Sequence, residues 1–144
     1  MDFEMCLAAA ALARSAHKGQ TDRAGRPYIE HPTRVAQKAK TFDEYTVAML
    51  HDVAEDCPEW PLARLAEHFP PNIIAALECL TKRPGEDYEA FIERVATNPL
   101  AVRVKLADLA DNSDLTRLPR VTDKDRERNA KYARATARLQ EVAA

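Results

Sequence analysis

The sequence predicts an all-α protein, from its composition and the spacing of its apolar residues. Alanine is abundant among the 144 residues, glycine occurs only 3 times, and β-branched and aromatic residues are modest in number. This composition favours helices. Apolar residues recur at helical spacing between prolines and polar clusters. The length suits one domain with a real core, so we expect residues 1–144 to form a single compact bundle of about eight helices.

Proline, glycine and apolar periodicity place the helices along the chain. Gly19 is a natural end for the first helix, and Pro32 and Pro99 suit the first turn of later ones. Pro58 and Pro61 should end the helix that precedes them. The predicted helices cover residues 2–18, 32–40, 42–56, 62–68, 70–80, 86–96, 99–115 and 123–142.

Charge and cysteine content narrow the functional classes. The net charge of −2 argues against non-specific nucleic-acid binding, which needs a basic surplus, but a local basic cluster could still bind a small anion. Cys6, Cys57 and Cys79 form no CxxC pair, so neither a disulfide framework nor a zinc knuckle is indicated. No apolar run is long enough to span a bilayer. We therefore expect a cytoplasmic protein with reduced thiols and no membrane contact.

The segment HDVAED concentrates four ionisable side chains in six residues. In one continuous helix, His51 would lie above Glu55 and Asp52 above Asp56, all on one flank. The neighbouring residues are apolar, so this flank should face the interior or a cleft. Three carboxylates so close together repel unless a proton or cation neutralises them, and a metal ion is the simplest answer. Taken alone, the segment also fits an ordinary acidic helix end, so the decision depends on ligands elsewhere.

A second polar group lies within the apolar helix LAVRVKLADLADNSDL. Asp108 and Asn112 are four residues apart, and Lys105 precedes Asp108 by three, so the three side chains share one face. A carboxylate, an amide and an ammonium on a mostly buried helix are hard to explain by solvation alone. We expect Asp111 and Asp114, by contrast, to face solvent.

His31, His51, Asp52 and Asp108 together form a candidate metal site drawn from three separate segments. Two imidazoles and two carboxylates suit Mn²⁺, Fe²⁺, Co²⁺ or Zn²⁺, and four protein ligands leave positions open on a metal that prefers six. Open positions indicate catalysis rather than a structural metal. The other two carboxylates of HDVAED would then be free to orient or deprotonate an attacking water.

Three ordered blocks, GRPYIEHP, AMLHDVAEDC and VRVKLADLADN, with AHKGQ and LTKRPGE as weaker support, resemble the HD-domain metal-dependent phosphohydrolases. The resemblance is specifically to the hydrolase domain of the RelA/SpoT homologue family, which removes the 3′-pyrophosphate from the alarmones ppGpp and pppGpp. It implies an HD-type fold like that of the small stand-alone alarmone hydrolases. It also implies that His31, His51, Asp52 and Asp108 take the family's metal-ligand positions, usually filled by Mn²⁺.

The resemblance further implies roles for residues around the metal. Glu55 and Asp56 take the positions of the catalytic carboxylate pair, and Asn112 that of a residue contacting the nucleotide sugar or phosphate. The basic residues expected to offset charge on the substrate are Lys18, Arg23, Lys82 and Lys105. Arg126, Arg128 and Lys131 of the last helix are further candidates for reaching a ligand phosphate.

Two departures from the family pattern keep other substrates open. The loop before PYIEHP usually carries two adjacent basic residues, the first stacking on guanine, whereas this chain has Asp22 and Arg23. Leu109 and Asp111 stand where the long alarmone enzymes have a basic residue and a histidine. The alternatives are a phosphatase acting on another nucleotide, such as the 2′-phosphate of NADPH, and an HD module that senses a nucleotide without cleaving it.

Overall fold

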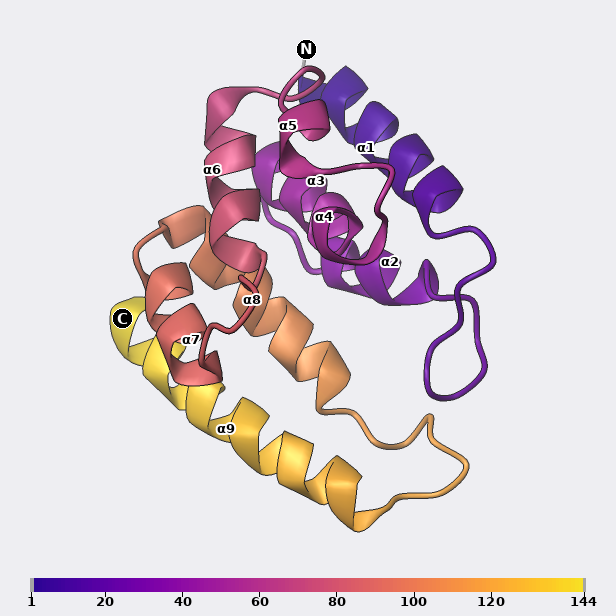
Figure 1. The fold of residues 1–144 in the computed structure, drawn as a ribbon, viewed down its shortest axis with the longest axis vertical. Helices are drawn as coiled ribbons and strands as arrows, with labels where there is room; N and C mark the ends of the chain where they lie inside the picture. The colour runs from indigo at the N-terminus through magenta and orange to yellow at the C-terminus, as the bar shows by residue number, and fades with distance from the viewer. Residues whose placement is uncertain (1, 144) are drawn as a thin grey trace.

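The structure, a computed structural model, describes residues 2–143 as a helical bundle (Figure 1). Within that range there are nine helices and no named strand, so the all-α prediction is confirmed. The helices are α1 (Asp2–Ala16), α2 (Glu30–Gln37), α3 (Phe42–Leu50), α4 (Val53–Asp56), α5 (Leu62–Leu65), α6 (Pro71–Leu80), α7 (Tyr88–Ala96), α8 (Pro99–Asn112) and α9 (Asp123–Ala143).

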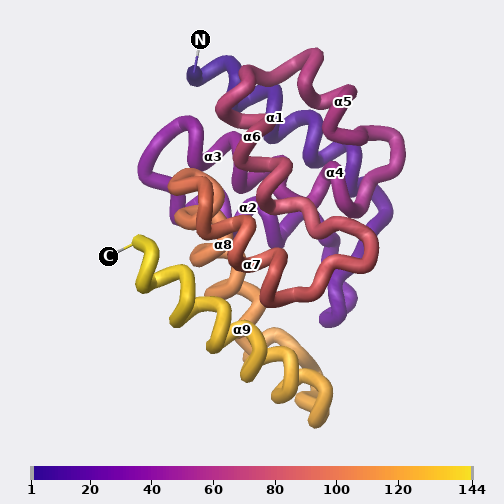
Figure 2. The backbone as a smooth tube through the Cα atoms, turned by 60° about the vertical axis from the view of Figure 1, so that its left-hand side comes forward, coloured from indigo at the N-terminus to yellow at the C-terminus, as the bar shows by residue number. Residues whose placement is uncertain are grey.

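Helix α3 is the centre of the upper part of the bundle in Figure 1, where it packs against α1, α2, α6 and α8. Helix α8 joins this group to α9, which lies along α7 and α8 on the lower side (Figures 1 and 2). The largest fully buried apolar side chains come from five different helices and include Leu50, Leu65, Ile73, Leu77, Leu109 and Leu139. The core therefore holds α3 and α8, which carry candidate ligands, in fixed relation.

Local capping explains where several helices begin. Asn98 precedes α8, and its side chain accepts a hydrogen bond from the Ala101 N–H at 2.9 Å, while Pro99 occupies the first turn. Thr41 caps α3 in the same way by accepting from the Glu44 N–H at 3.1 Å. The predicted starts of these two helices are confirmed.

The single helix predicted over 42–56 is wrong, because the chain turns at His51 and Asp52 between α3 and α4. The His51 side chain explains the break: its Nδ1 lies 2.6 Å from the Ala48 carbonyl oxygen. In a continuous helix that carbonyl would accept from the Asp52 N–H. The helix resumes at Val53, with the Asp56 N–H donating to the Asp52 carbonyl at 2.9 Å. The two halves of HDVAED therefore belong to different elements.

The loop 17–29 is folded by its own polar groups. Asp22 Oδ1 accepts hydrogen bonds from the Ala24 and Arg26 N–H groups, each at 2.9 Å. Gly25 has a φ of 80°, a left-handed conformation that favours glycine. This turn directs the following residues toward α2, which positions His31.

Among the helices of residues 2–143, none combines the length and the apolar character that crossing a membrane requires.

Candidate metal centre and adjoining clefts

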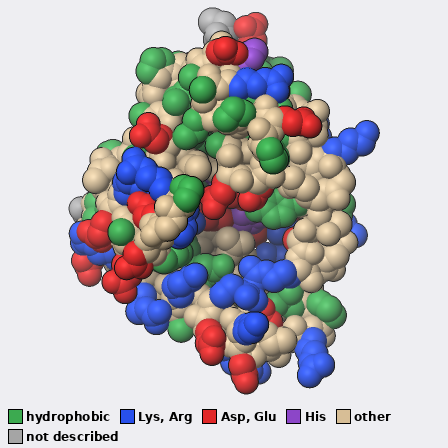
Figure 3. All heavy atoms as spheres, viewed as in Figure 1, with side chains coloured by type: hydrophobic (Ala, Val, Ile, Leu, Met, Phe, Trp, Pro, Cys, Tyr) green, Lys and Arg blue, Asp and Glu red, His purple; other side chains and the backbone are tan. Residues whose placement is uncertain are grey.

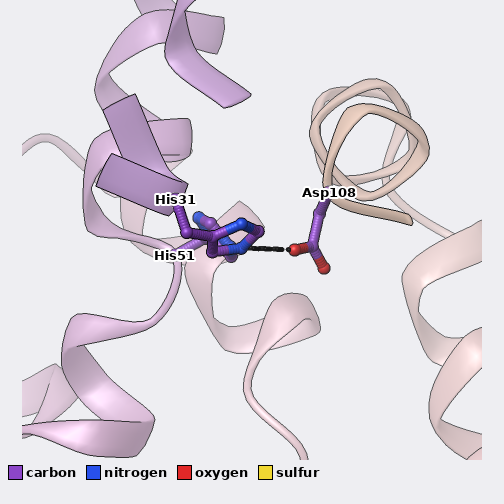
Figure 4. Close-up of side chains that lie close together, drawn as sticks. All are labelled: His31, His51 and Asp108. Carbon is purple, nitrogen blue, oxygen red and sulfur yellow. Dashed lines mark hydrogen bonds and ion pairs between the residues drawn. The ribbon is translucent and has the colours of Figure 1, made fainter. Parts of the chain in front are cut away.

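Three buried side chains from separate elements meet in the middle of the bundle (Figure 4). His31 comes from α2, His51 directly follows α3, and Asp108 comes from α8. Each offers one ligand atom, and these atoms all lie within 4.8 Å of one another. Their side chains are only 3–5% exposed. The fold thus brings together three of the four residues predicted as metal ligands.

The fourth predicted ligand, Asp52, borders this group. Its Oδ2 lies 3.1 Å from His51 Nε2 and 3.6 Å from His31 Nε2. The Tyr28 hydroxyl donates to the same oxygen at 2.6 Å. Asp52 therefore faces both imidazoles while the loop before α2 fixes its orientation.

The chemistry of His51 fits a bound cation. The Ala48 carbonyl only accepts, so Nδ1 carries a proton, and in the neutral imidazole Nε2 presents a lone pair. That Nε2 is buried with no hydrogen-bond partner among residues 2–143, and it faces carboxylate oxygens of Asp52 and Asp108 at 3.1 and 3.3 Å. Such a buried group of acceptors needs a positive charge between its members, which a proton or a divalent transition metal supplies.

His31 is oriented by a residue whose location was predicted wrongly. Asp111 was expected to face solvent, but it is 6% exposed and its Oδ2 lies 2.7 Å from His31 Nδ1. Arg34 also binds it, with Nε 2.8 Å from Oδ1. Burial alone would raise the pKa of Asp111, but hydrogen bonds from His31 and Arg34 hold it below its ordinary value. The burial follows from tertiary packing, since α2 covers this side of α8.

Asp108 links the centre to two other polar residues of α8, Lys105 and Asn112. Its Oδ1 lies 2.8 Å from His31 Nε2 and accepts from Asn112 Nδ2 at 3.1 Å. Its Oδ2 accepts from the Lys105 ammonium at 2.9 Å. The shared face predicted for Lys105, Asp108 and Asn112 is confirmed by these contacts.

A cleft of about 340 Å³ opens beside the centre. His51, Asp52 and Asp108 form part of its wall. The other residues that line it are Tyr28, Glu55, Asp56, Leu80, Lys82, Tyr88, Phe91, Lys105, Asn112, Lys131 and Tyr132. Figure 3 shows this face hollowed near its middle, with acidic side chains above the hollow and basic side chains below it. The metal centre, the acidic pair and three lysines therefore share one cleft.

Glu55 and Asp56 reach this cleft from the short helix α4. Partial burial and the neighbouring Asp52 carboxylate raise the pKa of both side chains. A raised pKa makes a carboxylate a better proton acceptor. The pair is therefore suited to taking a proton from water in the cleft.

A second cleft, of about 350 Å³, adjoins the first, since Tyr28, Asn112 and Tyr132 line both. Arg23 lies here, with Nη1 3.7 Å from Asp125 Oδ1. The arginines that line this cleft are Arg23, Arg34, Arg117 and Arg128, each of which has a carboxylate partner.

The other basic residues suggested by the sequence divide between cleft and solvent. Lys82, Lys105 and Lys131 line the first cleft, and Arg128 lines the second. Lys18 and Arg126 are exposed and line neither cleft.

The sequence interpretation missed two residues, Tyr28 and Asp111. Tyr28 stands in the block GRPYIEHP but received no role. Asp111 follows Asp108 by three residues, a spacing that places both on the same side of a helix. That spacing was the signal that could have identified it.

An all-helical bundle with a buried histidine and aspartate cluster is the arrangement of the HD-domain class. Residues 9–140 match the family model described as HD domain. The chain therefore belongs to the HD-domain family.

Curated relatives within this family carry alarmone-related names. The chain is similar to the guanosine-3′,5′-bis(diphosphate) 3′-pyrophosphohydrolase of Vibrio cholerae, with 32% identity over 114 residues, which is 71% of this chain and 16% of the relative. The enzyme of the same name from Aquifex aeolicus is 31% identical over 113 residues, 70% of this chain and 16% of the relative. The bifunctional (p)ppGpp synthase/hydrolase SpoT of Escherichia coli is 29% identical over 116 residues, again 70% and 16%. The chain thus spans only a small part of each relative's length.

A solved structure shares the fold. It is that of a metazoan orthologue of SpoT that hydrolyzes ppGpp. The TM-score is 0.78 at 21% sequence identity, and the match covers 94% of this chain and 84% of the other. The HD-type helical architecture expected from the sequence is therefore confirmed.

Proposed function

We propose that this protein is a metal-dependent phosphohydrolase that removes the 3′-pyrophosphate from ppGpp and pppGpp. One observation carries the proposal: the buried His31, His51 and Asp108 cluster opens on a cleft that also holds an acidic pair and three lysines. The relatives named as 3′-pyrophosphohydrolases support the choice of substrate.

In this proposal His31, His51, Asp52 and Asp108 hold the metal. Their imidazole and carboxylate groups suit several divalent transition metals, and we take the ion to be Mn²⁺ because it usually fills these positions in the family that the sequence resembles. When bound, the ion supplies Lewis acidity toward a phosphate oxygen and makes a nearby water easier to deprotonate. The protein's own contribution to this site is orientation. The Ala48 carbonyl fixes the ring of His51, and Tyr28 fixes the carboxylate of Asp52.

Glu55 and Asp56 are assigned the proton transfer. Water attacks the phosphorus joined to the ribose 3′ oxygen, a new P–O bond forms and the P–O3′ bond breaks. The pyrophosphoryl group becomes free pyrophosphate, and the departing 3′ oxygen takes up a proton to become the 3′ hydroxyl of GDP or GTP. One carboxylate of the pair accepts the proton that the water gives up. Their raised pKa supports this role, because a more basic carboxylate holds that proton more readily.

We assign to the lysines of the cleft the role of offsetting the negative charge of the substrate's phosphates. Lys82 and Lys131 line the same cleft as the acidic pair. Lys105 is already paired with Asp108, so its positive charge is shared between this metal-binding carboxylate and the substrate. Fixed positive charge near the pyrophosphoryl group stabilises the negative charge on its oxygens in the transition state.

The test is product analysis with the purified protein, loaded with Mn²⁺, on ppGpp and NADPH side by side. We expect pyrophosphate and GDP from ppGpp, and loss of turnover in Asp52→Ala and Asp108→Ala with helical content retained. Asp123→Ala, an exposed carboxylate on α9, is the control and should keep activity. Retained turnover in both ligand variants would refute the metal assignment.

A second candidate, a phosphatase acting on another nucleotide such as NADPH, is favoured by the position of Asp22. Its carboxylate closes the loop turn through two backbone hydrogen bonds, and Arg23 pairs with Asp125. Neither residue therefore supplies the adjacent basic pair that the family uses at the guanine. Phosphate released from NADPH, with ppGpp left intact, would select this candidate.

The third reading, a nucleotide sensor without turnover, is less well supported. A sensor gains nothing from a water-activating pair, yet Glu55 and Asp56 both line the cleft beside the metal centre. Tight binding of ppGpp in Mn²⁺ without product would favour it.

In each case the proposed partner is a small phosphorylated nucleotide. We place the reaction in the cytoplasm, with residues 1–144 acting as one hydrolase domain.

A further inference from the structure

Asp111 contacts His31 from the side of the ring opposite Asp108. It contacts Nδ1 of His31, the ring nitrogen opposite the one directed at Asp108. Because a carboxylate accepts hydrogen bonds, this 2.7 Å contact calls for a proton on Nδ1, so a metal bound between His31 and Asp108 would take its lone pair from Nε2.

Two arginines hold Asp111 in place from different parts of the chain. Arg34, one turn after His31 on α2, donates from Nε to Oδ1 at 2.8 Å and from Nη2 to Oδ2 at 3.1 Å. Arg117, beyond the end of α8, donates to the Asp111 backbone carbonyl at 2.9 Å and approaches Oδ1 at 3.5 Å. A two-pronged arginine contact restricts the carboxylate to one geometry.

We propose that Asp111 is the positioning residue that sets the metal affinity of this centre through His31. It fixes the ring rotation and the tautomer that direct Nε2 at the ion, and its negative charge makes that nitrogen a stronger donor. The inference rests on the proposed metal site and goes beyond it, since it assigns affinity to a residue that does not touch the ion. Loss of such an outer carboxylate typically lowers metal affinity 10–100-fold.

Asp114 provides a matched control for charge. It lies three residues further along and also pairs with Arg117, at 3.0 Å, but it is exposed and bonds to Thr116 rather than to a histidine. Asp111→Asn and Asp114→Asn remove the same charge from neighbouring positions. A difference between them therefore reports the contact with His31 and not the general negative field.

The experiment is a titration of the metal-stripped protein with Mn²⁺ alone, by calorimetry. We expect Asp111→Asn to raise the dissociation constant 10–100-fold and Asp114→Asn to leave it within about twofold. Long-range ¹H–¹⁵N spectra of the imidazoles give a second readout. The His31 tautomer should become mixed in Asp111→Asn and stay unchanged in Asp114→Asn.

A further control is needed to show that the variant still folds correctly, because Asp111→Asn leaves Arg34 without its carboxylate partner. The double variant Arg34→Met, Asp111→Asn removes both charges and should show the same loss of affinity with a native circular dichroism spectrum. Equal Mn²⁺ affinities in Asp111→Asn and Asp114→Asn would overturn the inference. Failure of the unaltered protein to bind Mn²⁺ would instead overturn the proposed metal site.

Discussion

Lys105→Met should destabilise the protein strongly without metal and much less with it. The Lys105 ammonium lies 2.9 Å from Asp108 Oδ2, and the two side chains are 14% and 5% exposed. The pair is therefore essentially buried. Burial opposes the charge on Lys105, yet the Asp108 carboxylate holds the pKa of Lys105 above its ordinary value, so the pair is ionised.

The magnitude follows from the burial. Removing one partner of a buried ion pair costs about 3–5 kcal/mol, because the other charge stays buried and here loses the strongest of its compensating charges. For a chain of this size that corresponds to a fall of roughly 10–20 °C in Tm. Methionine has a similar length and stays in apolar contact near Phe91, whose ring centre is 5.2 Å from Lys105 Nζ, so little of the loss should come from a cavity.

A bound divalent ion changes this balance, since it supplies positive charge to the same carboxylate. In saturating Mn²⁺ we expect the destabilisation by Lys105→Met to fall to less than about half of its metal-free value. The assay is thermal unfolding followed by circular dichroism at pH 8, in EDTA and in Mn²⁺. Lys124→Met, an exposed lysine on α9, is the control and should change Tm little in either condition.

Two results would refute this reasoning. A loss below about 1 kcal/mol in EDTA would mean that the pair is not effectively buried. An equal loss in EDTA and Mn²⁺ would mean that Lys105 and the metal do not neutralise the same carboxylate.

Three further predictions test the site and the fold separately. Tyr28→Phe removes the 2.6 Å hydrogen bond to Asp52 and should lower kcat about 3–10-fold with KM for ppGpp unchanged, measured by steady-state kinetics; an unchanged kcat would contradict the orienting role. Arg94 lowers the pKa of Glu86 to about 2. Ionised Glu86 therefore stabilises the folded state fully at pH values above the ordinary pKa of glutamate, and this contribution is lost as the pH falls through about 2. Glu86→Gln should therefore reduce stability to urea at pH 7, with the difference from the unaltered protein vanishing toward pH 2; a constant difference at all pH values would count against it. Leu77→Ala, at a fully buried position of α6, should cost about 2–5 kcal/mol in urea unfolding, and a smaller loss would mean that the core closes around the cavity.

The helical class, most helix starts and the set of candidate ligands could be predicted from local sequence patterns. These depend on local chemistry: Asn98 and Pro99 start α8 through a side-chain cap and a preset φ, wherever α8 then packs. The face shared by Lys105, Asp108 and Asn112 follows from helical spacing in the same way. Such features are set within a few residues of chain, so periodicity and capping rules are enough to predict them.

The surroundings of those residues depend on how the helices pack and could not be predicted in this way. Asp111 carries a charge, which is typical of a surface position. Helix α2 nevertheless packs over it and supplies both His31 and Arg34 as partners. The break at His51 is a local effect, because its side chain contacts the Ala48 carbonyl three residues earlier, but periodicity does not show which way a side chain turns. Lys18 looked equivalent to Lys82 in the sequence, but only Lys82 lines a cleft. Burial and partner choice depend on residues distant in the chain, and for that reason spacing alone did not reveal them.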